Sequence, residues 1–417
     1  MYSASHGFVL SSGMAALDII TRLIKPHSTI VTGDDLYGGT NRLLNYLRNN
    51  NGVIVHHVDT TNPSSVFPYL TPDVSMVLLE SPTNPLLKVA DLPKIIAEAK
   101  ERVPNAIVVV DNTMMGPYLQ RPLEFGADIV YDSATKYLSG HHDLMAGVIV
   151  CNRDDLAKQM AHMVNSVGNG LSPFDSFLLL RGVKTLVIRM DRQQASARVV
   201  AEWLFGLGFH VNYPGLKSHP NREVHERISD GPGAVLSFTT GDKSLSEKIV
   251  AGTRLWGITV SFGCINSLIS MPCLMSYVIY FLLCILGPQP SLYSRHASID
   301  PATRAARGFP EDVIRLCVGI EDPEDLIEDL RHAMFEAGAI ELSASTEQPY
   351  VRAKPKVEDP ISRAVEKLGK ELSSIGTNRP KENREWLVSA PGKVILFGEH
   401  AVVHGVVGGP VCRFSGH

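Results

Sequence analysis

The sequence has few cysteines, no excess of one charge and no long apolar segment, and each absence excludes a class of protein. None of the six cysteines in the 417 residues forms a CxxC pair, so neither a zinc site nor a dithiol redox pair is expected. Lys and Arg total 39 against 43 Asp and Glu, and the net charge of -4 provides no attraction towards nucleic acid or an anionic membrane. We therefore expect no metal and neither of these partners.

Targeting signals are also missing from the start of the sequence. Residues 1–20 lack a basic segment followed by an apolar one, and they lack the Arg-rich amphipathic pattern of a transit peptide. The continuous apolar stretch Tyr277–Gly287 falls short of the roughly 20 residues that a membrane span needs. Together with the scattered cysteines, these absences favour a cytoplasmic protein, unless an organelle signal precedes this sequence.

What the sequence does contain is an alternation of β-branched runs with helical patterns. The composition, 44% hydrophobic and 20% charged, is that of a globular protein long enough for more than one domain. The alternation predicts an α/β fold with a large, mostly parallel sheet covered by helices. The predicted strands are Thr29–Gly33, Gly52–Asp59, Val74–Glu80, Ala106–Asp111, Ile129–Asp132 and Gly147–Cys151.

Four consecutive regions are expected along the chain. Residues 1–205 form the large domain, which ends in helical segments over 172–205, and residues 206–345 form a smaller α/β domain. The segment 346–385 is rich in Pro, Lys, Glu and Ser and is expected to be a linker. Residues 386–417 then turn apolar and glycine-rich again and make up the fourth region.

Polar residues end several of the predicted strands. Glu80 and Asp111 close two of them, and Asp132 with Ser133 closes a third. Ligands of such sheets bind beyond the carboxyl ends of the strands. These side chains are therefore expected to share one site.

Asp111 and Lys136 supply two groups that pyridoxal phosphate requires. The cofactor needs a lysine for its aldehyde, an acid facing its pyridine nitrogen, a phosphate-binding element and an aromatic ring partner. Asp111 follows a buried strand, where an aspartate could otherwise cap a turn or helix. Lys136 lies between the hydroxyls of Ser133 and Thr135, although a solvated loop lysine is the more common role. The run Ser11–Ala16 starts an apolar helix, whose N–H groups suit a phosphate.

Six motifs occur together, and in this combination the chain resembles the cystathionine lyase and synthase family of pyridoxal-phosphate enzymes over about residues 8–340. The motifs are SSGMAA at 11–16, DDLYGGTNR at 34–42, ESPTNP at 80–85, VVDNT at 109–113, SATKYLSGH at 133–141 and IRLCVGIEDPEDLIEDL at 314–330. The resemblance implies the type I fold of pyridoxal-phosphate enzymes, similar to aspartate aminotransferase, with a smaller C-terminal α/β domain. It also implies a homotetramer, assembled as a dimer of dimers.

The resemblance assigns a role to each matching residue. Lys136 would form the Schiff base, Asp111 would face the pyridine nitrogen, and Tyr37 would stack on the ring and act with Lys136 in catalysis. Four residues would surround the phosphate: Gly13, Met14, Ser133 and Thr135. Three would bind the amino-acid substrate: Asn84, Ser261 and Arg315. The planar fork of an arginine suits a carboxylate, although a surface salt bridge is the usual role of a single arginine.

The segment around Ser261 bears on the reaction. Val260–Gly263, followed by Asn266–Pro272, most resembles the cystathionine β-lyases of plants and fungi, whereas many γ-processing relatives have an acidic residue just before that serine. The resemblance thus implies a carbon–sulfur lyase of transsulfuration and methionine biosynthesis, which cleaves L-cystathionine to homocysteine, pyruvate and ammonia. A γ-lyase or γ-synthase stays open as an alternative.

Two further segments depart from the family pattern. Relatives begin well before the SSGMAA run, so a YxRxxNPT-like segment that reaches a neighbouring subunit's phosphate is expected to be missing. Tyr277–Arg295 has no counterpart in the family and is expected to be an insertion, either a translated intron or a buried core helix. A catalytically incompetent fragment or fusion is therefore a second hypothesis for the whole chain.

The C-terminal region carries a second resemblance. Residues 386–409 are similar to the opening of mevalonate kinases, and Lys393, Glu399 and His400 match the residues that this family directs towards its substrate. The glycine-rich phosphate loop of that family lies further on, and this sequence ends at His417. A kinase is therefore the least favoured hypothesis.

Overall fold

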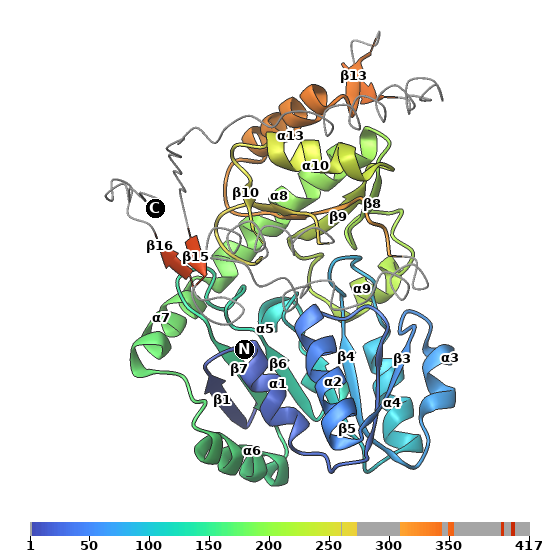
Figure 1. The fold of residues 1–417 in the computed structure, drawn as a ribbon, viewed down its shortest axis with the longest axis vertical. Helices are drawn as coiled ribbons and strands as arrows, with labels where there is room; N and C mark the ends of the chain where they lie inside the picture. Colours follow the sequence, from blue (N-terminus) through green and yellow to red (C-terminus); the bar gives the residue numbers. More distant parts are fainter. Residues whose placement is uncertain are drawn as a thin grey trace, which may run out of the picture. The chain divides into compact units, whose positions relative to one another are not determined.

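The computed structural model describes residues 2–259, 261–272, 309–343 and 349–353, together with the backbone of 393–395 and 402–404. The chain divides into two units, Met1–Arg352 and Ala353–His417. In the first unit, a seven-stranded sheet with its helices occupies the lower part of Figure 1, and a five-stranded sheet the upper part. The predicted insertion Tyr277–Arg295 lies outside the described residues, as does most of the predicted linker.

The seven-stranded sheet has the order β1-β7-β6-β5-β4-β2-β3. Neighbours from β3 to β6 pair in parallel, while β7 is antiparallel to both β6 and β1. The prediction of an α/β fold with a mostly parallel sheet is confirmed. Its strands are β1 (His6–Leu10), β2 (Thr29–Gly33), β3 (Ile54–Val58), β4 (Val74–Glu80), β5 (Ile107–Asp111), β6 (Ile129–Asp132) and β7 (Gly147–Cys151).

Helices cover both faces of this sheet because its strands are apolar on both sides. Alternate residues of β5 face opposite ways, so that Val109 packs with α1, α2 and α6, while Val108 and Val110 pack with α4. The helices are α1 (Gly13–Thr21), α2 (Gly38–Asn51), α3 (Pro63–Val66), α4 (Leu92–Arg102), α5 (Gly116–Leu119) and α6 (Asp154–Val167), with 3-10 turns at Phe67–Tyr69 and Pro122–Phe125.

The five-stranded sheet has the order β10-β11-β12-β9-β8 and is mostly antiparallel. Helices α8 (Leu186–Gly206), α10 and α13 pack on it and enclose a core that includes Phe238, Ile249 and Leu330. Its elements are β8 (His210–Asn212), α9 (Arg222–Ile228), β9 (Val235–Thr239), α10 (Lys243–Gly252), β10 (Gly257–Ile258), β11 (Leu268–Ser270), β12 (Val313–Cys317) and α13 (Pro323–Ala337).

Two helices connect the sheets, α7 (Pro173–Lys184) and α8 (Leu186–Gly206). They occupy the region for which the sequence predicts helical segments. Ser172 caps α7, since its side chain accepts a hydrogen bond from the Asp175 amide at 3.1 Å. None of the helices in the described part of the chain is both long and apolar enough to span a bilayer.

A short hairpin follows α13. Strand β13 (Ile340–Leu342) pairs with β14 (Tyr350–Arg352), so the first residues of the expected linker extend the first unit. In the second unit, β15 (Lys393–Ile395) pairs with β16 (Val402–His404) in an antiparallel hairpin. The four-region division of the chain and the kinase-like character of 386–417 stay predictions; Glu399 and His400 lie outside the described residues.

Candidate active site

Two carboxylates meet at the carboxyl edge of the large sheet. Glu80 ends β4 and Asp111 ends β5, and the parallel register places them directly opposite each other. Both are buried, with exposed fractions of 7% and 9%. Burial raises the pKa of both groups, and the Asp111 charge raises the pKa of Glu80 further. The site therefore favours a cation beside this pair.

Three donors fix the Asp111 carboxylate. Its Oδ1 accepts hydrogen bonds from the Thr113 hydroxyl at 2.5 Å and from the Thr113 amide at 3.0 Å. The Tyr131 hydroxyl also donates to this carboxylate, and these bonds lower the pKa that burial raises. Asp111 thus caps the turn that follows β5, as the alternative interpretation of the sequence had it, while its carboxylate stays at the sheet edge.

Lys136 is a buried lysine, 6% exposed, just beyond β6. Its Nζ donates a hydrogen bond to Ser261 Oγ at 3.0 Å and lies 5.2 Å from the centre of the Phe262 ring. Burying an ammonium costs free energy unless it is paired or used. The solvated-loop interpretation of Lys136 is therefore excluded.

The start of α1 lies against the loop after β6. Ser12 caps the helix by accepting a bond from the Ala15 amide at 3.0 Å. A Cβ atom on Gly13 would lie 2.7 Å from Ser133 Cβ, so only glycine permits this close approach of the two backbones. Met14 follows in the same turn. A helix N-terminus beside a serine is suited to hold a phosphate.

Thr135 and Ser133 have different hydrogen-bond partners. Its hydroxyl accepts a bond from the Ala146 amide at 3.0 Å and donates to the Ala146 carbonyl at 3.2 Å. The Ser133 amide donates to the Thr113 hydroxyl at 2.9 Å, which links the loop after β6 to the turn at Asp111. Thr135 thus anchors its loop to the start of β7, and its predicted phosphate contact stays a prediction.

Arg315 on β12 faces the large sheet. It is 5% exposed, so a surface salt bridge is excluded. Its guanidinium donates to Asn84 Oδ1 at 3.0 Å and to the Ser261 carbonyl at 2.9 Å. Burial lowers the pKa of Arg315. These contacts bring together the three residues predicted to bind the substrate.

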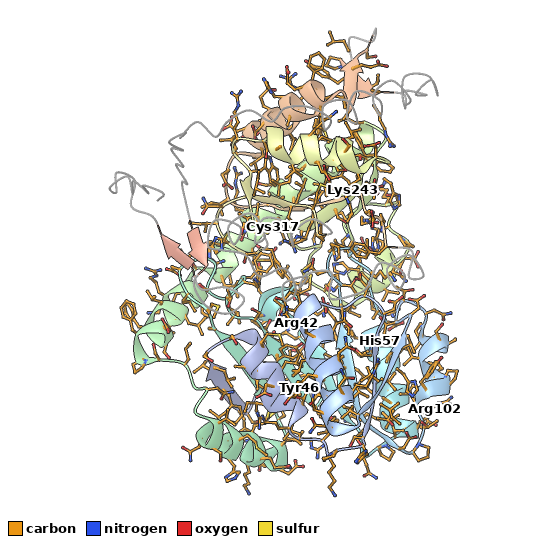
Figure 2. All side chains as sticks on the ribbon, in the orientation of Figure 1. Arg42, Tyr46, His57, Arg102, Lys243 and Cys317 are labelled. Carbon is orange, nitrogen blue, oxygen red and sulfur yellow. The ribbon has the colours of Figure 1, made fainter. Side chains whose placement is uncertain are left out.

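Tyr37 is the N-cap residue of α2. Its amide donates to Glu80 Oε2 at 3.1 Å. Burial raises the pKa of its phenol, nearby Arg42 and Arg315 lower it, and Asp111 with Glu80 raises it again. Figure 2 labels Arg42 on α2 and Cys317, at the end of β12, on either side of the boundary between the two sheets.

Several residues of this site were not predicted from the sequence as site residues. Thr113, Tyr131 and Phe262 lie beside predicted residues, but their types carry no signal of their own. Arg189 and Gln193 of α8 could have been noticed, because their spacing places these polar residues on the same helix face as the buried apolar residues.

The donor set fits pyridoxal phosphate. Lys136 can reach an aldehyde, Asp111 can pair with a pyridinium, and the close approach of Gly13 to Ser133 brings the N-terminus of α1 beside the Ser133 hydroxyl, a combination that suits a phosphate. Tyr37 supplies the aromatic ring. The chemistry of the residues thus agrees with the cofactor predicted from the sequence.

Comparison with known proteins decides the family. The model of the Cys/Met metabolism PLP-dependent enzymes matches residues 1–280 and 288–335. The chain belongs to this family. Its cofactor is pyridoxal phosphate, and both the resemblance and the type I fold predicted from the sequence are confirmed. The gap between the two matched blocks, 281–287, falls within the predicted insertion.

Individual members of the family show the same relationship. A cystathionine beta-lyase of Neurospora crassa is 59% identical over 341 residues, which cover 82% of this chain and 70% of that protein. A cystathionine beta-lyase of Schizosaccharomyces pombe is 45% identical over 338 residues, which cover 81% of this chain and 82% of that protein. The solved cystathionine gamma-lyase of Lactobacillus plantarum, complexed with L-serine, superposes with a TM-score of 0.73 at 31% identity, covering 80% of this chain and 83% of that one.

Proposed function

We propose that this PLP-dependent enzyme cleaves L-cystathionine at its β-carbon, which yields homocysteine, pyruvate and ammonia in transsulfuration towards methionine. The observation that carries the proposal is the continuous chain of contacts from the Lys136 amine through Ser261 to Arg315 and Asn84. It sets a base next to a carboxylate-binding arginine, as removal of the proton beside an amino-acid carboxylate requires. The identity to curated cystathionine beta-lyases supports the choice of substrate.

Arg315 and Asn84 fix the substrate carboxylate in this proposal. The guanidinium offers a planar fork of N–H donors, which matches two carboxylate oxygens. Asn84 Oδ1 holds one arm of that fork and the Ser261 carbonyl holds the other. The orientation of the fork is therefore set before the substrate arrives, which lowers the entropy cost of binding.

Lys136 and Tyr37 handle the protons. When bound, pyridoxal phosphate supplies a sink for the electron pair left at the α-carbon. The Lys136 amine removes the α-proton, and the electron pair then expels homocysteine thiolate from the β-carbon. Lys136 or Tyr37 returns a proton to the sulfur, and water converts the remaining enamine to pyruvate and ammonia.

The choice between β- and γ-cleavage depends on the segment around Ser261. The described residues place Ser261 on the Lys136 amine, while Val260, whose context favours β-elimination, lies outside the described residues. Solved relatives include a cystathionine gamma synthase of Xanthomonas oryzae pv. oryzae, in complex with cystathionine, at 36% identity and a TM-score of 0.73. A γ-lyase or γ-synthase is therefore the alternative that the experiment must separate.

Product analysis separates the two cleavages. The purified chain is incubated with L-cystathionine and pyridoxal phosphate, and the thiol and the oxo acid are identified by mass spectrometry. Homocysteine with pyruvate supports the proposal. Cysteine with 2-oxobutyrate assigns a γ-lyase, and no product from a protein that binds the cofactor supports the hypothesis of a catalytically incompetent chain.

We also propose that the chain works as a cytoplasmic homo-oligomer, a dimer of dimers. In support, α7 and the start of α8 expose large apolar side chains, with exposed fractions of 69% for Phe174, 63% for Phe177, 56% for Leu180 and 69% for Ile188. Exposed apolar patches of this kind mark contact surfaces. Light scattering tests the assembly, and Phe177→Ser combined with Leu180→Ser is expected to lower the measured mass.

A further inference from the structure

Arg189 is a buried arginine beneath the loop that carries Lys136. It belongs to α8 and is 4% exposed. Its Nη2 donates to the Tyr137 carbonyl at 2.8 Å and to the Gly182 carbonyl at 2.9 Å, and its Nε donates to the Thr185 hydroxyl at 3.0 Å. Tyr137 directly follows the lysine. Arg189 therefore anchors the backbone next to Lys136 to α8.

Among the described residues, Arg189 donates hydrogen bonds to neutral oxygens, and its Nη1 has no hydrogen-bond partner. Burial lowers the pKa of this guanidinium to about 10. Burial of a cation without a carboxylate partner destabilises the folded state. A long apolar side chain would fill the same volume without this cost, so the geometry points to a role beyond filling space.

Gly140, at the other end of the same loop, lies so close to Arg189 that a larger residue would clash with it. Its φ is +69°, a conformation that favours glycine, and a Cβ atom there would lie 2.0 Å from Arg189 Nη1. The Gly140 amide donates to the Lys136 carbonyl at 2.8 Å. The loop Ser133–Gly140, here called the lysine loop, is thus closed on itself and seated on Arg189.

Gln193 lies one turn further along α8 and holds the opposite part of the site. Its exposed fraction is 0%, and its Nε2 donates to the Cys264 carbonyl at 2.8 Å and to the Val318 carbonyl at 3.0 Å. Cys264 belongs to the loop Ser261–Ile265, here called the serine loop, and Val318 directly follows β12, which carries Arg315.

The two loops are also joined to each other. The Ile265 amide donates to the Gly140 carbonyl at 2.9 Å. Gly263 has a φ of +79°, and a Cβ atom there would lie 2.7 Å from the Tyr137 nitrogen and 3.0 Å from Lys136 Cβ. Neighbouring positions of α8, four residues apart, thus hold two segments that belong to different sheets.

We propose that Arg189 and Gln193 are positioning residues, which clamp the lysine loop and the serine loop to one face of α8 and so fix Lys136 relative to Arg315. The inference rests on the proposed function for the roles of Lys136 and Arg315. Arg189 acts on the base, and Gln193 acts on the substrate-binding side. Loss of each side chain should therefore affect a different kinetic constant.

The variants Arg189→Met and Gln193→Leu remove the donors and keep the approximate volume. For Arg189→Met, kcat with L-cystathionine is expected to fall about 10- to 100-fold, with KM changed less than about 3-fold, because a small displacement of a catalytic group is costly. For Gln193→Leu, KM is expected to rise about 10-fold, with a smaller change in kcat. Arg189→Lys, which retains the charge and part of the donors, should recover part of kcat.

Amide hydrogen exchange of the full chain, with and without cofactor, gives a readout that does not need activity. Exchange over 133–141 is expected to rise about 10-fold in Arg189→Met, and exchange over 261–267 to rise similarly in Gln193→Leu, while peptides of β2 and β4 stay unchanged. The matched control is Arg198→Met, an exposed arginine on the same helix, which should leave all these values as in the wild type.

Unchanged exchange and kinetics in folded Arg189→Met protein would overturn the proposal, and so would a uniform rise of exchange over the whole first unit. If Arg189→Met does not fold, Gln193→Leu and the wild-type protein test the proposal instead. Rapid amide exchange at Gly140 and Ile265 in the wild type, as in an exposed loop, would also overturn the proposal. A wild-type chain without lyase activity contradicts the proposed function, yet the exchange of the two loops still tests the clamp.

Discussion

The cofactor half and the substrate half of this site are built in different ways. In the cofactor half, the contacts among Asp111, Thr113 and Ser133 join residues at most about 20 positions apart, and the more distant Gly13 approaches Ser133 at the same end of one sheet. In the substrate half, Arg315 meets Asn84 across 231 positions, and Lys136 meets Ser261 across 125. The first half depends on one parallel sheet, while the second requires two sheets to dock. Substitutions should therefore separate cofactor binding from substrate binding.

Lys136 is common to both halves and is the proposed base, so its removal should have the largest effect. Lys136→Ala is expected to lower the rate of β-elimination by about 10³-fold or more, because the proposed base is lost. The visible absorbance of the bound cofactor should also change. Lys158→Ala, at an exposed position of α6, is the control. Substantial turnover by Lys136→Ala would assign the base to another residue.

Arg315→Lys tests the substrate half alone. An ammonium cannot reproduce the planar fork that binds Asn84 and the Ser261 carbonyl, so kcat/KM is expected to fall about 10- to 100-fold, mainly through KM. Cofactor affinity, measured by absorbance titration, should stay within about 2-fold of the wild type, since Arg315 is placed on the substrate side. An equal loss of cofactor affinity would mean that the halves are not separable.

Gly13→Ala tests the cofactor half alone. The added Cβ would lie 2.7 Å from Ser133 Cβ and would push the helix start away from the loop. Overpacking of this kind costs about 1–3 kcal/mol, and each 1.4 kcal/mol is a factor of ten, so cofactor affinity should fall about 10-fold. The KM for substrate at saturating cofactor should not change. Gly206→Ala, where a Cβ meets open space, is the matched control.

Asp132→Asn should have the smallest effect on turnover and changes the pH dependence of stability instead. Burial raises the pKa of Asp132 from 3.8 to about 7, while Tyr2 donates to its Oδ2 at 2.6 Å. Because the folded state binds this proton more tightly than the unfolded state, the contribution to stability is present below about pH 4 and is lost as the pH rises through about 7.

Urea unfolding of the two proteins between about pH 4 and about pH 8 measures this contribution. The wild type should lose stability relative to Asp132→Asn as the pH rises, at a slope of up to about 1.4 kcal/mol per pH unit. Parallel stability curves for the two proteins would show that Asp132 ionises at its ordinary pKa.

The strands were largely predictable, because a buried parallel sheet needs continuous apolar runs. Thr29–Gly33, Val74–Glu80, Ile129–Asp132 and Gly147–Cys151 have the predicted bounds. Strand β1, His6–Leu10, was not predicted: it is an edge strand with alternating burial, and its pairing with β7 joins segments about 140 residues apart. Local pattern carries no information on such a pairing.

The site was predictable in part for a related reason. Lys136 and Asp111 follow apolar strands, and the topology of parallel sheets places strand ends at one edge. Thr135 shows the limit, because the loop geometry turns its hydroxyl to the Ala146 backbone. Glu80 was predicted at the shared edge, but its hydrogen bond to the Tyr37 amide depends on how α2 begins.

By itself, the sequence determined the α/β fold, the family and the cofactor, since periodicity and contiguous motifs are local properties of the chain; for the residues of the cofactor half it provided predictions. Only the tertiary structure decided that Lys136 and Arg315 are buried, that Ser261 joins them, and that Arg189 and Gln193 lie beneath both loops. These are contacts between segments distant in sequence, and they form because docking of the two sheets buries their apolar faces together.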